Sequence, residues 1–467
     1  MATARRPKGA PKRLIFSAFA MNTGSHIWHG TWRHPDARQA EFNDLKMWVE
    51  LVRLLERGRF DALFLADVSG LYGDYKGGWE TFVREGLQIP SNDPLILAAA
   101  LILATEHLGI GITSSIVQEQ PFNFARRMST FDHLSNGRAG WNIVTGILEN
   151  AARNFGLDHL EEHDERYARA EEYCDVAYKL WEGSWEDNAL KVDRAGSVFS
   201  DPTKIHKIDH HGERYSVEGP HLPSPSPQRS PLLFQAGSSP AGREFAARHA
   251  EASFITAPNP TLAGEMIRDV RARAARNGRN PDDIIFLQGV TPVVGSSEEE
   301  ARRKAQEIDD YVSTDGLLAH VSGAVGIDFG DLSPETPLSQ VQGPGQQGIV
   351  KELMAAAPAD REATIGDFAR MTRGLRLIGT PEQIADELEI WAAEGVGGFN
   401  IVYALLPGTF ADFIDHVVPV LQHRGLMQRD YAPGTLREKL FDRGPRLDAR
   451  HAGRQVRIAA APAAAAA

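Results

Sequence analysis

The feature that most constrains the fold of this chain is the alternation of short apolar runs with longer amphipathic segments. Apolar runs of strand length, each followed by a segment of helical periodicity, indicate parallel strands buried on both faces. So many repeats favour an α/β fold of the (β/α)8 (TIM) barrel type over an open doubly wound sheet. The expected strands are 13–20, 61–67, 108–113, 139–145, 231–237, 252–256, 284–293, 375–380 and 398–403. The expected helices are near 41–58, 93–107, 121–134, 164–182, from 239 onward, 261–277, 297–313, 381–395 and 409–422.

Three stretches do not fit the repeat, and we interpret them as insertions over the C-terminal mouth of the barrel. They cover about 68–92, about 183–230 and about 315–372. Functional residues are expected at this mouth, because the active sites of such barrels lie at the C-terminal ends of the strands. The remaining boundaries predict one domain over 13–440, a flexible N-terminus over 1–12 and a disordered, low-complexity tail over 441–467.

Charge and motif content narrow the function. A net charge of −12 argues against nucleic acid and anionic membranes and favours small-molecule partners. The single cysteine, Cys174, excludes an intramolecular disulfide framework and fits a reducing cytoplasm. The chain has no Walker A, G-x-S-x-G or H-E-x-x-H sequence. The stretch "GPGQQG" at 343–348 has the letters of a dinucleotide fingerprint, but it follows a polar loop instead of a strand and is not interpreted as one.

One strand-to-helix turn could bind an anion. Residues 232–250 read "LLFQAGSSPAGREFAARHA", with Gly237, Ser238 and Ser239 between an apolar run and a helix. Ser239 is a good N-cap, Pro240 fits the first helical position, and Gly237 lets other groups approach the backbone closely. A helix N-terminus with free N–H groups attracts anions, although most capped turns of this kind bind nothing. The local sequence leaves both readings open.

Other polar residues stand at predicted strand ends. Asp67 closes the buried run "DALFLAD", where it is either a ligand-binding carboxylate or an exposed loop residue. Asn142 and Thr145 interrupt an apolar strand near its end, and an amide and a hydroxyl suit the carbonyls and imide of a ring cofactor; backbone pairing is the alternative. Tyr167 lies on the apolar face of its helix, either in the core or with its hydroxyl toward a ligand.

Histidines cluster after the first predicted strand, in "MNTGSHIWHGTWRHPDA". Flanking tryptophans and the lack of nearby carboxylates argue against a metal site, and none is predicted elsewhere. A proton donor or a substrate-positioning role suits His26 and His29 better, because histidine titrates near neutral pH and this loop leaves a strand.

Nine ordered blocks of sequence carry a family resemblance over roughly residues 13–440. They are GTWRHPDAR (30–38), LLERGRFDALFLADV (54–68), NDPL (92–95), TEHLGIGIT (105–113), ARRMSTFDHLSNGRAGWNIVT (125–145), HDERYARAEEY (163–173), KLWEGSWEDNAL (179–190), PSPQRSPLLFQAGSSPAGREFAARHAE (225–251) and IGTPEQIADEL (378–388). The chain resembles the two-component flavin-dependent monooxygenases of the bacterial luciferase-like superfamily, in the branch of the nitrilotriacetate, dibenzothiophene-sulfone and long-chain alkane enzymes.

The resemblance implies a barrel that takes reduced FMN from a separate NAD(P)H:flavin reductase. The reduced flavin would react with O2 to a C4a-peroxyflavin that oxygenates the substrate. Carried over by position, the isoalloxazine and ribityl chain would contact Asp67, Asn142 and Thr145. Tyr167 and the Gly237-Ser238-Ser239 turn would hold the phosphate. The insertion near 315–372 would be a lid with His320 facing the substrate. A homodimer or homotetramer is expected.

The substrate end of the predicted pocket is apolar and aromatic. It comprises Phe19, Met21, Thr23, Trp28 and Tyr72, beside His26. Several alkane-type members carry a cysteine where this chain has Thr23. A hydrophobic substrate, such as an organosulfur compound, an alkane or a halogenated aromatic that would lose halide, is favoured over a polyanionic chelate. A deazaflavin-dependent hydride-transfer enzyme and a flavin-binding protein without oxygenase activity are the alternative functions.

Overall fold

Eight parallel strands close a barrel, which confirms the predicted fold class. The computed structural model describes residues 13–73, 75–325, 327–340, 362–371 and 373–456. Around the barrel the order is β1-β2-β3-β4-β9-β10-β11-β13, and β13 pairs again with β1. The strands are β1 (Ile15–Met21), β2 (Ala62–Ala66), β3 (Gly109–Ser115), β4 (Ala139–Val144), β9 (Leu232–Gln235), β10 (Ala252–Ile255), β11 (Ile285–Val294) and β13 (Gly398–Val402).

One of the nine predicted strands, at 375–380, lies outside the barrel. β12 (Leu375–Gly379) pairs in parallel with residues 290–294 of β11, whereas residues 287–290 of β11 pair with β13. β11 is ten residues long, so its first part belongs to the barrel and its second part carries the extra strand. The apolar pattern could not separate these two kinds of strand, because both are parallel and carry apolar residues.

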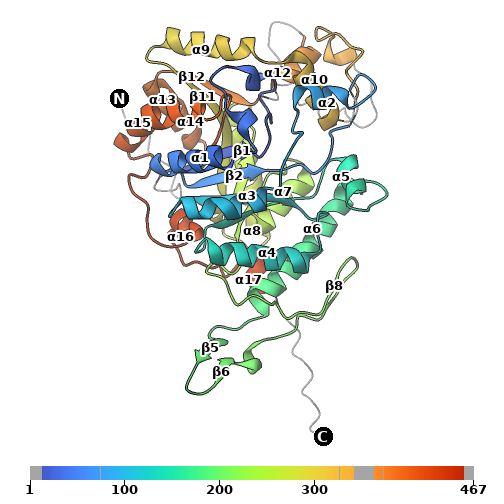
Figure 1. Cartoon of the computed structure of the whole chain (residues 1–467), viewed down its shortest axis with the longest axis vertical. Helices are drawn as coiled ribbons and strands as arrows, with labels where there is room; N and C mark the ends of the chain where they lie inside the picture. The colour runs from blue at the N-terminus through green and yellow to red at the C-terminus, as the bar shows by residue number, and fades with distance from the viewer. Residues whose placement is uncertain (1–12, 74, 326, 341–361, 372, 457–467) are drawn as a thin grey trace.

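Helices cover the outside of the barrel, as the amphipathic segments predicted (Figure 1). Their starts follow local chemistry: the side chains of Asp44, Asp93 and Ser239 each accept a hydrogen bond from a backbone N–H in the first turn of a helix. The helices are α1 (Leu45–Arg57), α3 (Pro94–Leu101), α4 (Pro121–Leu134), α5 (Glu149–Asn154), α6 (His163–Tyr178), α7 (Pro240–His249), α8 (Pro260–Arg276), α9 (Glu298–Asp310), α13 (Pro381–Ala393), α14 (Gly408–Asp412) and α15 (Val418–His423).

Aromatic side chains fill the centre of the barrel. The Phe64 ring centroid lies 5.6 Å from that of Phe19 and 4.4 Å from that of Phe254. Leu436, at the start of α16 (Leu436–Phe441), belongs to the same buried cluster. A Cβ added to Gly109, at the first residue of β3, would lie 2.6 Å from Leu436 Cδ1, so α16 closes the N-terminal end of the barrel.

Two of the three predicted insertions pack together on the C-terminal side. The first contains α2 (Glu80–Glu85), and the last contains α10 (Thr314–Val325) and α12 (Ile365–Met371). Phe82, Leu318 and Ile365 share one buried apolar cluster, separate from the main core. Figure 1 shows α2, α10 and α12 side by side at the upper end of the molecule.

The prediction was wrong for the insertion at 183–230, which lies at the opposite end of the barrel. Its hairpins β5 (Leu190–Asp193) with β6 (Val198–Ser200) and β7 (His210–His211) with β8 (Ser216–Val217) extend from the lower end in Figure 1. Ser129 Oγ and His221 Nε2, 2.8 Å apart, join this segment to the C-terminal part of α4. The segment joins a helix to the next strand, and such connections lie at the N-terminal ends of barrel strands.

The chain remains packed beyond residue 441, where a disordered tail was predicted to begin. His451 is buried, and its Nε2 lies 2.9 Å from the carbonyl oxygen of His249. It precedes a short helix, α17 (Ala452–Gln455). The ranges 1–12 and 457–467 and the "GPGQQG" stretch at 343–348 lie outside the described residues. Within the described ranges no helix is long and apolar enough to cross a membrane.

Candidate functional site

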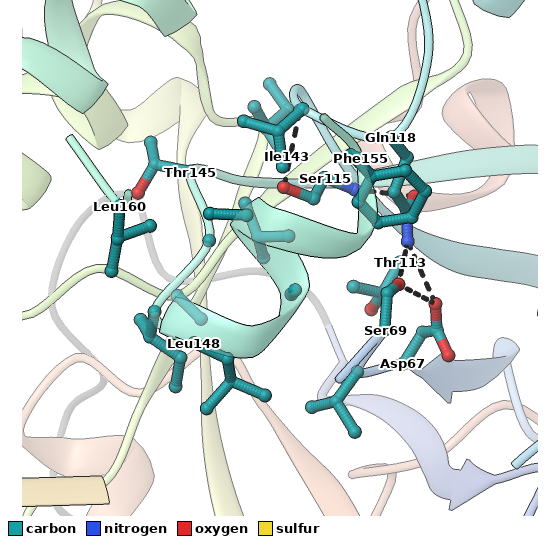
Figure 2. Close-up of a pocket in the computed structure, with 18 of the residues that line it drawn as sticks. Asp67, Ser69, Thr113, Ser115, Gln118, Ile143, Thr145, Leu148, Phe155 and Leu160 are labelled. Atoms are coloured by element: carbon teal, nitrogen blue, oxygen red, sulfur yellow. Dashed lines mark hydrogen bonds between the residues drawn. The ribbon is translucent and has the colours of Figure 1, made fainter. Parts of the chain in front are cut away.

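A pocket of about 320 Å³ opens where β2, β3, β4 and β9 end. Polar residues come from these strand ends: Asp67 after β2, Ser115 at the end of β3, Thr145 after β4 and Gln235 at the end of β9. The opposite wall is apolar and comes from α5 and its flanking loops. It includes Ile147, Leu148, Ala151, Ala152, Phe155 and Leu160. Figure 2 labels Leu148, Phe155 and Leu160 of this wall. An apolar cavity with a few converging polar groups is the usual form of a small-molecule site.

Asp67 belongs to a polar network at one end of this pocket. Gln118 Nε2 donates to Asp67 Oδ2 at 3.1 Å, and Ser69 Oγ donates to the same oxygen at 3.4 Å (Figure 2). Burial raises the pKa of Asp67 to about 6, although the Gln118 hydrogen bond favours the ionised form. The carboxyl group therefore titrates just below neutrality, within reach of a bound ligand.

Asn142 lies beside the pocket, in the middle of β4. Its Nδ2 donates to Thr113 Oγ1 at 3.0 Å, and Thr113 lines the pocket. Asn142 is buried and its Oδ1 has no hydrogen-bond partner among the described residues. A buried, unpaired amide oxygen is costly, so a donor from a ligand would satisfy it.

The turn after β9 lies against Tyr167 of α6. The side chain of Ser239 accepts from the Gly242 N–H at 3.0 Å and caps α7, as predicted. A Cβ added to Gly237 would lie 2.6 Å from the Tyr167 hydroxyl oxygen, and one added to Gly242 would lie 2.7 Å from it. Only glycine fits at these two positions. The Tyr167 hydroxyl also hydrogen-bonds the side chains of Ser239 and Gln235, and burial raises its pKa.

Two arginines near this turn were not predicted from the sequence. Arg166 donates through Nη1 to the carbonyl of Gly146, a pocket residue, and its buried Nε has no partner among the described residues. Arg243 Nε donates to the Ser238 carbonyl at 2.8 Å. Arg243 lies in the first turn of α7, where Asp269 pairs with it, and the charge of Arg166 acts on the Tyr167 hydroxyl. Gln118 was also missed, although it could have been found as Asp67 was, because it follows the end of a buried strand.

The predicted catalytic histidines lie together on the neighbouring side of the mouth: His26 and His29 follow β1, and His320 is in α10. His26, His29 and His320 form what we call the histidine cluster. The His29 and His320 ring centroids are 4.9 Å apart, and a proton on His320 would lower the pKa of both other rings. None of the three lines the pocket just described.

Burial keeps the histidine cluster neutral. It lowers the pKa of His26 to about 3 and that of His320 to about 4, and it lowers the pKa of His29 well below its ordinary value. The His26 ring lies between Phe19 and Tyr403, with centroids 5.0 and 4.8 Å away, and neither ring nitrogen has a partner among the described residues.

The predicted substrate residues lie in three places. Phe19 and Tyr72 contact the histidine cluster, since the Tyr72 and His320 ring centroids are 4.9 Å apart. Met21 ends β1, and Thr23 follows it with Oγ1 donating to the Pro90 carbonyl at 2.7 Å. Trp28 lies elsewhere: its indole N–H donates to Thr291 at 3.2 Å, and its ring contacts the guanidinium groups of Arg373 and Arg376.

A parallel (β/α)8 barrel with a ligand pocket and a buried histidine cluster at its C-terminal mouth defines a class of barrel enzymes that act on small molecules. Residues 21–397 match the family model described as luciferase-like monooxygenase, and the chain belongs to this family. It is thus a flavin-dependent monooxygenase, as the sequence blocks indicated.

Several known proteins are similar in sequence to this chain over nearly its whole length. A long-chain alkane monooxygenase of Geobacillus thermodenitrificans is 45% identical over 93% of this chain and 95% of its own. A dimethyl-sulfide monooxygenase of Hyphomicrobium sulfonivorans is 44% identical over 96% and 94%. The crystal structure of DmoA from Hyphomicrobium sulfonivorans matches with a TM-score of 0.89 at 43% identity, covering 96% of each chain.

Proposed function

We propose that this chain is the oxygenase component of a two-component system. It takes reduced FMN from a separate NAD(P)H:flavin reductase and uses O2 to oxygenate a small hydrophobic molecule. A nitrilotriacetate monooxygenase component A of Aminobacter aminovorans, 35% identical over 92% of this chain, supports the division into components. A cytoplasmic homodimer or homotetramer is part of the proposal.

The pocket beneath Tyr167 carries the assignment of FMN. Its turn has no room for a Cβ at Gly237, so only backbone meets a ligand there, and the capped N-terminus of α7 suits a phosphate. The unpaired Oδ1 of Asn142 fits a donor on the flavin ring. We assign the phosphate to Tyr167, Ser238 and Ser239, and the ring and ribityl chain to Asp67, Asn142 and Thr145. Bound reduced flavin supplies the electrons that activate O2.

The chain's own residues would exclude water and place the substrate. The half-buried aromatic side chains of Phe19 and Tyr72 lie beside the pocket together with the histidine cluster, of which His26 and His29 are buried. A region without charged side chains favours an apolar substrate over a chelate. Alkanes and organosulfur compounds, which name the relatives above, and halogenated aromatics with loss of halide, are the substrate classes to screen.

Deazaflavin-dependent hydride transfer remains the second candidate to test. The F420-dependent tetrahydromethanopterin reductase of Methanopyrus kandleri is 13% identical with a TM-score of 0.55, which indicates a shared fold alone. Supplying either reduced FMN with air or reduced deazaflavin, with the same substrate panel, separates the two. Oxygenated product only with reduced FMN is expected, whereas turnover only with deazaflavin would overturn the proposal.

The phosphate assignment is tested with two serines that have the same structural role. Ser239 caps α7 and Ser297 caps α9, each accepting from a backbone N–H of its first turn. Replacing either by Ala should cost about 1 kcal/mol of folding stability through the lost cap. Only Ser239→Ala should also weaken FMN binding, by roughly tenfold or about 1.4 kcal/mol. Riboflavin, which lacks the phosphate, should bind both variants as it binds the wild type.

A loss of riboflavin affinity equal to the loss of FMN affinity would place the phosphate elsewhere. An unchanged FMN affinity in Ser239→Ala would do the same. Equilibrium titrations under anaerobic conditions, with both ligands reduced, measure these constants. The wild-type ratio of FMN to riboflavin affinity is the reference value for each variant.

A further inference from the structure

A hydrogen-bonded chain of three side chains runs through the histidine cluster. Ser25 Oγ lies 2.9 Å from His29 Nδ1, and His29 Nε2 lies 2.8 Å from His320 Nδ1. Ser25 is 3% exposed and His29 is fully buried. Both nitrogens of His29 are therefore engaged within the protein, so this ring cannot itself contact a substrate.

The backbone holds these groups together although they are far apart in sequence. The Ser313 N–H donates to the His29 carbonyl at 2.8 Å, which ties the loop after β1 to the start of α10. A Cβ added to Gly316 would lie 2.8 Å from the His29 Cβ, so α10 packs directly on this residue. His320 is one turn further along the same helix. The contact between His29 and His320 is thus built into the packing.

The positions of the ring protons in the hydrogen-bonded series Ser25–His29–His320 follow from the hydroxyl of Ser25 at its end. Burial lowers the pKa of His29 and His320, so each neutral ring carries one proton on one of its two nitrogens. The hydroxyl hydrogen of Ser25 has one acceptor among the described residues, His29 Nδ1. If Ser25 accepted instead, this buried hydrogen would have no partner, which is costly. Ser25 therefore donates to His29, and His29 donates to His320 Nδ1.

We propose that Ser25 and His29 are positioning residues that hold His320 in its Nε2–H tautomer, so that the ring presents a neutral hydrogen-bond donor. Nε2 of His320 has no partner among the described residues, and the ring is half-buried beside Tyr72. A fixed, uncharged donor in a dry site stabilises negative charge that develops on an oxygen atom of a reactant. The role of His320 in the reaction rests on the proposed function, whereas its tautomer follows from the hydrogen bonds alone.

The tautomer is measured directly by NMR on the full chain with ring-15N-labelled histidine, in the absence of flavin. Two-bond 15N–1H correlations distinguish Nδ1–H, Nε2–H and charged rings, and the His320→Gln variant assigns its signal. The expected wild-type pattern for His320 is Nε2–H, unchanged from about pH 6 to about pH 8. A charged ring or an Nδ1–H ring would overturn the inference.

The role of Ser25 is tested by removing and restoring its hydroxyl. Ser25→Ala should move the His320 and His29 signals toward an average of the two tautomers, and Ser25→Thr should restore the wild-type pattern. Ser129→Ala is the matched control, because Ser129 is also buried beside a histidine, at the other end of the barrel. It should alter the His221 signal only. A His320 pattern that is the same in Ser25→Ala and wild type would overturn the role given to Ser25.

A kinetic measurement separates this inference from the proposed function. With reduced FMN, O2 and an accepted substrate, Ser25→Ala should lower kcat by about tenfold with little change in KM. Ser25→Thr should restore kcat. If no oxygenation is found for any variant, the proposed function fails while the NMR result still decides the tautomer. A normal kcat in a Ser25→Ala enzyme whose tautomers are mixed would overturn the positioning role.

Discussion

The pocket and the histidine cluster lie side by side at one mouth of the barrel, but their ionisable groups differ in hydrogen bonding and in pKa. In the pocket, Asp67 retains two hydrogen-bond donors, and its pKa is raised only to about 6. In the cluster, burial removes the charge from every ring, and His26 has no hydrogen-bond partner among the described residues. The pocket is suited to exchange a soluble, charged ligand, and the cluster is suited to keep a reaction dry.

The largest difference between the two regions is expected from a substitution at Gly237, which should weaken FMN binding and leave the histidine cluster unchanged. Gly237→Val would place a branched side chain where even a Cβ lies 2.5 Å from Gln235 Nε2 and 2.6 Å from the Tyr167 hydroxyl. Reduced FMN should bind roughly 100-fold more weakly, equivalent to about 2.7 kcal/mol. His320 should keep its wild-type NMR pattern, because it does not line the pocket. Gly444→Ala, where a Cβ meets nothing within 4 Å, is the control. Wild-type FMN affinity in Gly237→Val would show that the turn does not hold the ligand.

The next largest effect is expected at Asp67 and concerns stability. A carboxyl group with a pKa near 4 in the unfolded chain and about 6 in the folded protein binds its proton more tightly when folded. Stability contributed by this group therefore falls as pH rises from about 4 to about 6, and the cost persists above that range. Asp67→Asn should raise the free energy of unfolding by about 2 kcal/mol at pH 8 and leave it unchanged near pH 4.

Denaturant unfolding at both pH values measures this difference. Asp158→Asn, at an exposed position, is the control and should change stability little at either pH. A gain that is equal at the two pH values would mean that packing, and not the charge of Asp67, is responsible. If Asp67→Asn raises the free energy of unfolding and also weakens FMN binding, the wild-type carboxyl group favours ligand recognition at the expense of stability.

The sequence predicted those parts of the site that depend on one segment. Ser239 caps a helix after an apolar run, and Asp67 ends a buried strand; both features can be read within ten residues. Contacts between distant segments could not be predicted in this way. His29 and His320 are 291 positions apart, and their hydrogen bond depends on where the last insertion packs. Trp28 was predicted at the substrate end of the pocket. Its contacts with Thr291 of β11 and with Arg373 and Arg376 likewise join segments that are distant in the sequence.

The position of the insertion at 183–230 was missed for a topological reason. All three insertions are rich in turn residues, and composition does not tell which end of a barrel they cover. The preceding element distinguishes two of them: 68–92 follows a strand, whereas 183–230 follows α6. A connection after a strand begins at the C-terminal mouth, and one after a helix begins at the opposite end. The predicted order of strands and helices contained this distinction for these two insertions, but not for 315–372, which follows α9 and nevertheless packs against α2 at the C-terminal mouth.

The smallest effect on stability is expected for His26→Phe, in contrast to the same substitution at His249. Its ring is buried between Phe19 and Tyr403 without a hydrogen bond among the described residues. Phenylalanine has a similar shape and no unpaired polar atom, so His26→Phe should leave the free energy of unfolding equal or raise it by up to about 1 kcal/mol. His249→Phe should destabilise the fold, because His249 is equally buried but lies 3.1 Å from the Tyr178 hydroxyl and 3.0 Å from Glu171.

If His26 serves the reaction, His26→Phe should form less product per reduced FMN consumed and release more hydrogen peroxide. Its stability would be kept while its coupling is lost, which is the pattern of a residue retained for function. Product and peroxide are measured in the same reaction, with a substrate that the wild type accepts. Wild-type coupling in a stable His26→Phe protein would make His26 a packing residue and would leave His320 as the donor of the cluster. If His26→Phe instead lowers the free energy of unfolding, the His26 ring nitrogens form hydrogen bonds in solution that the substitution removes.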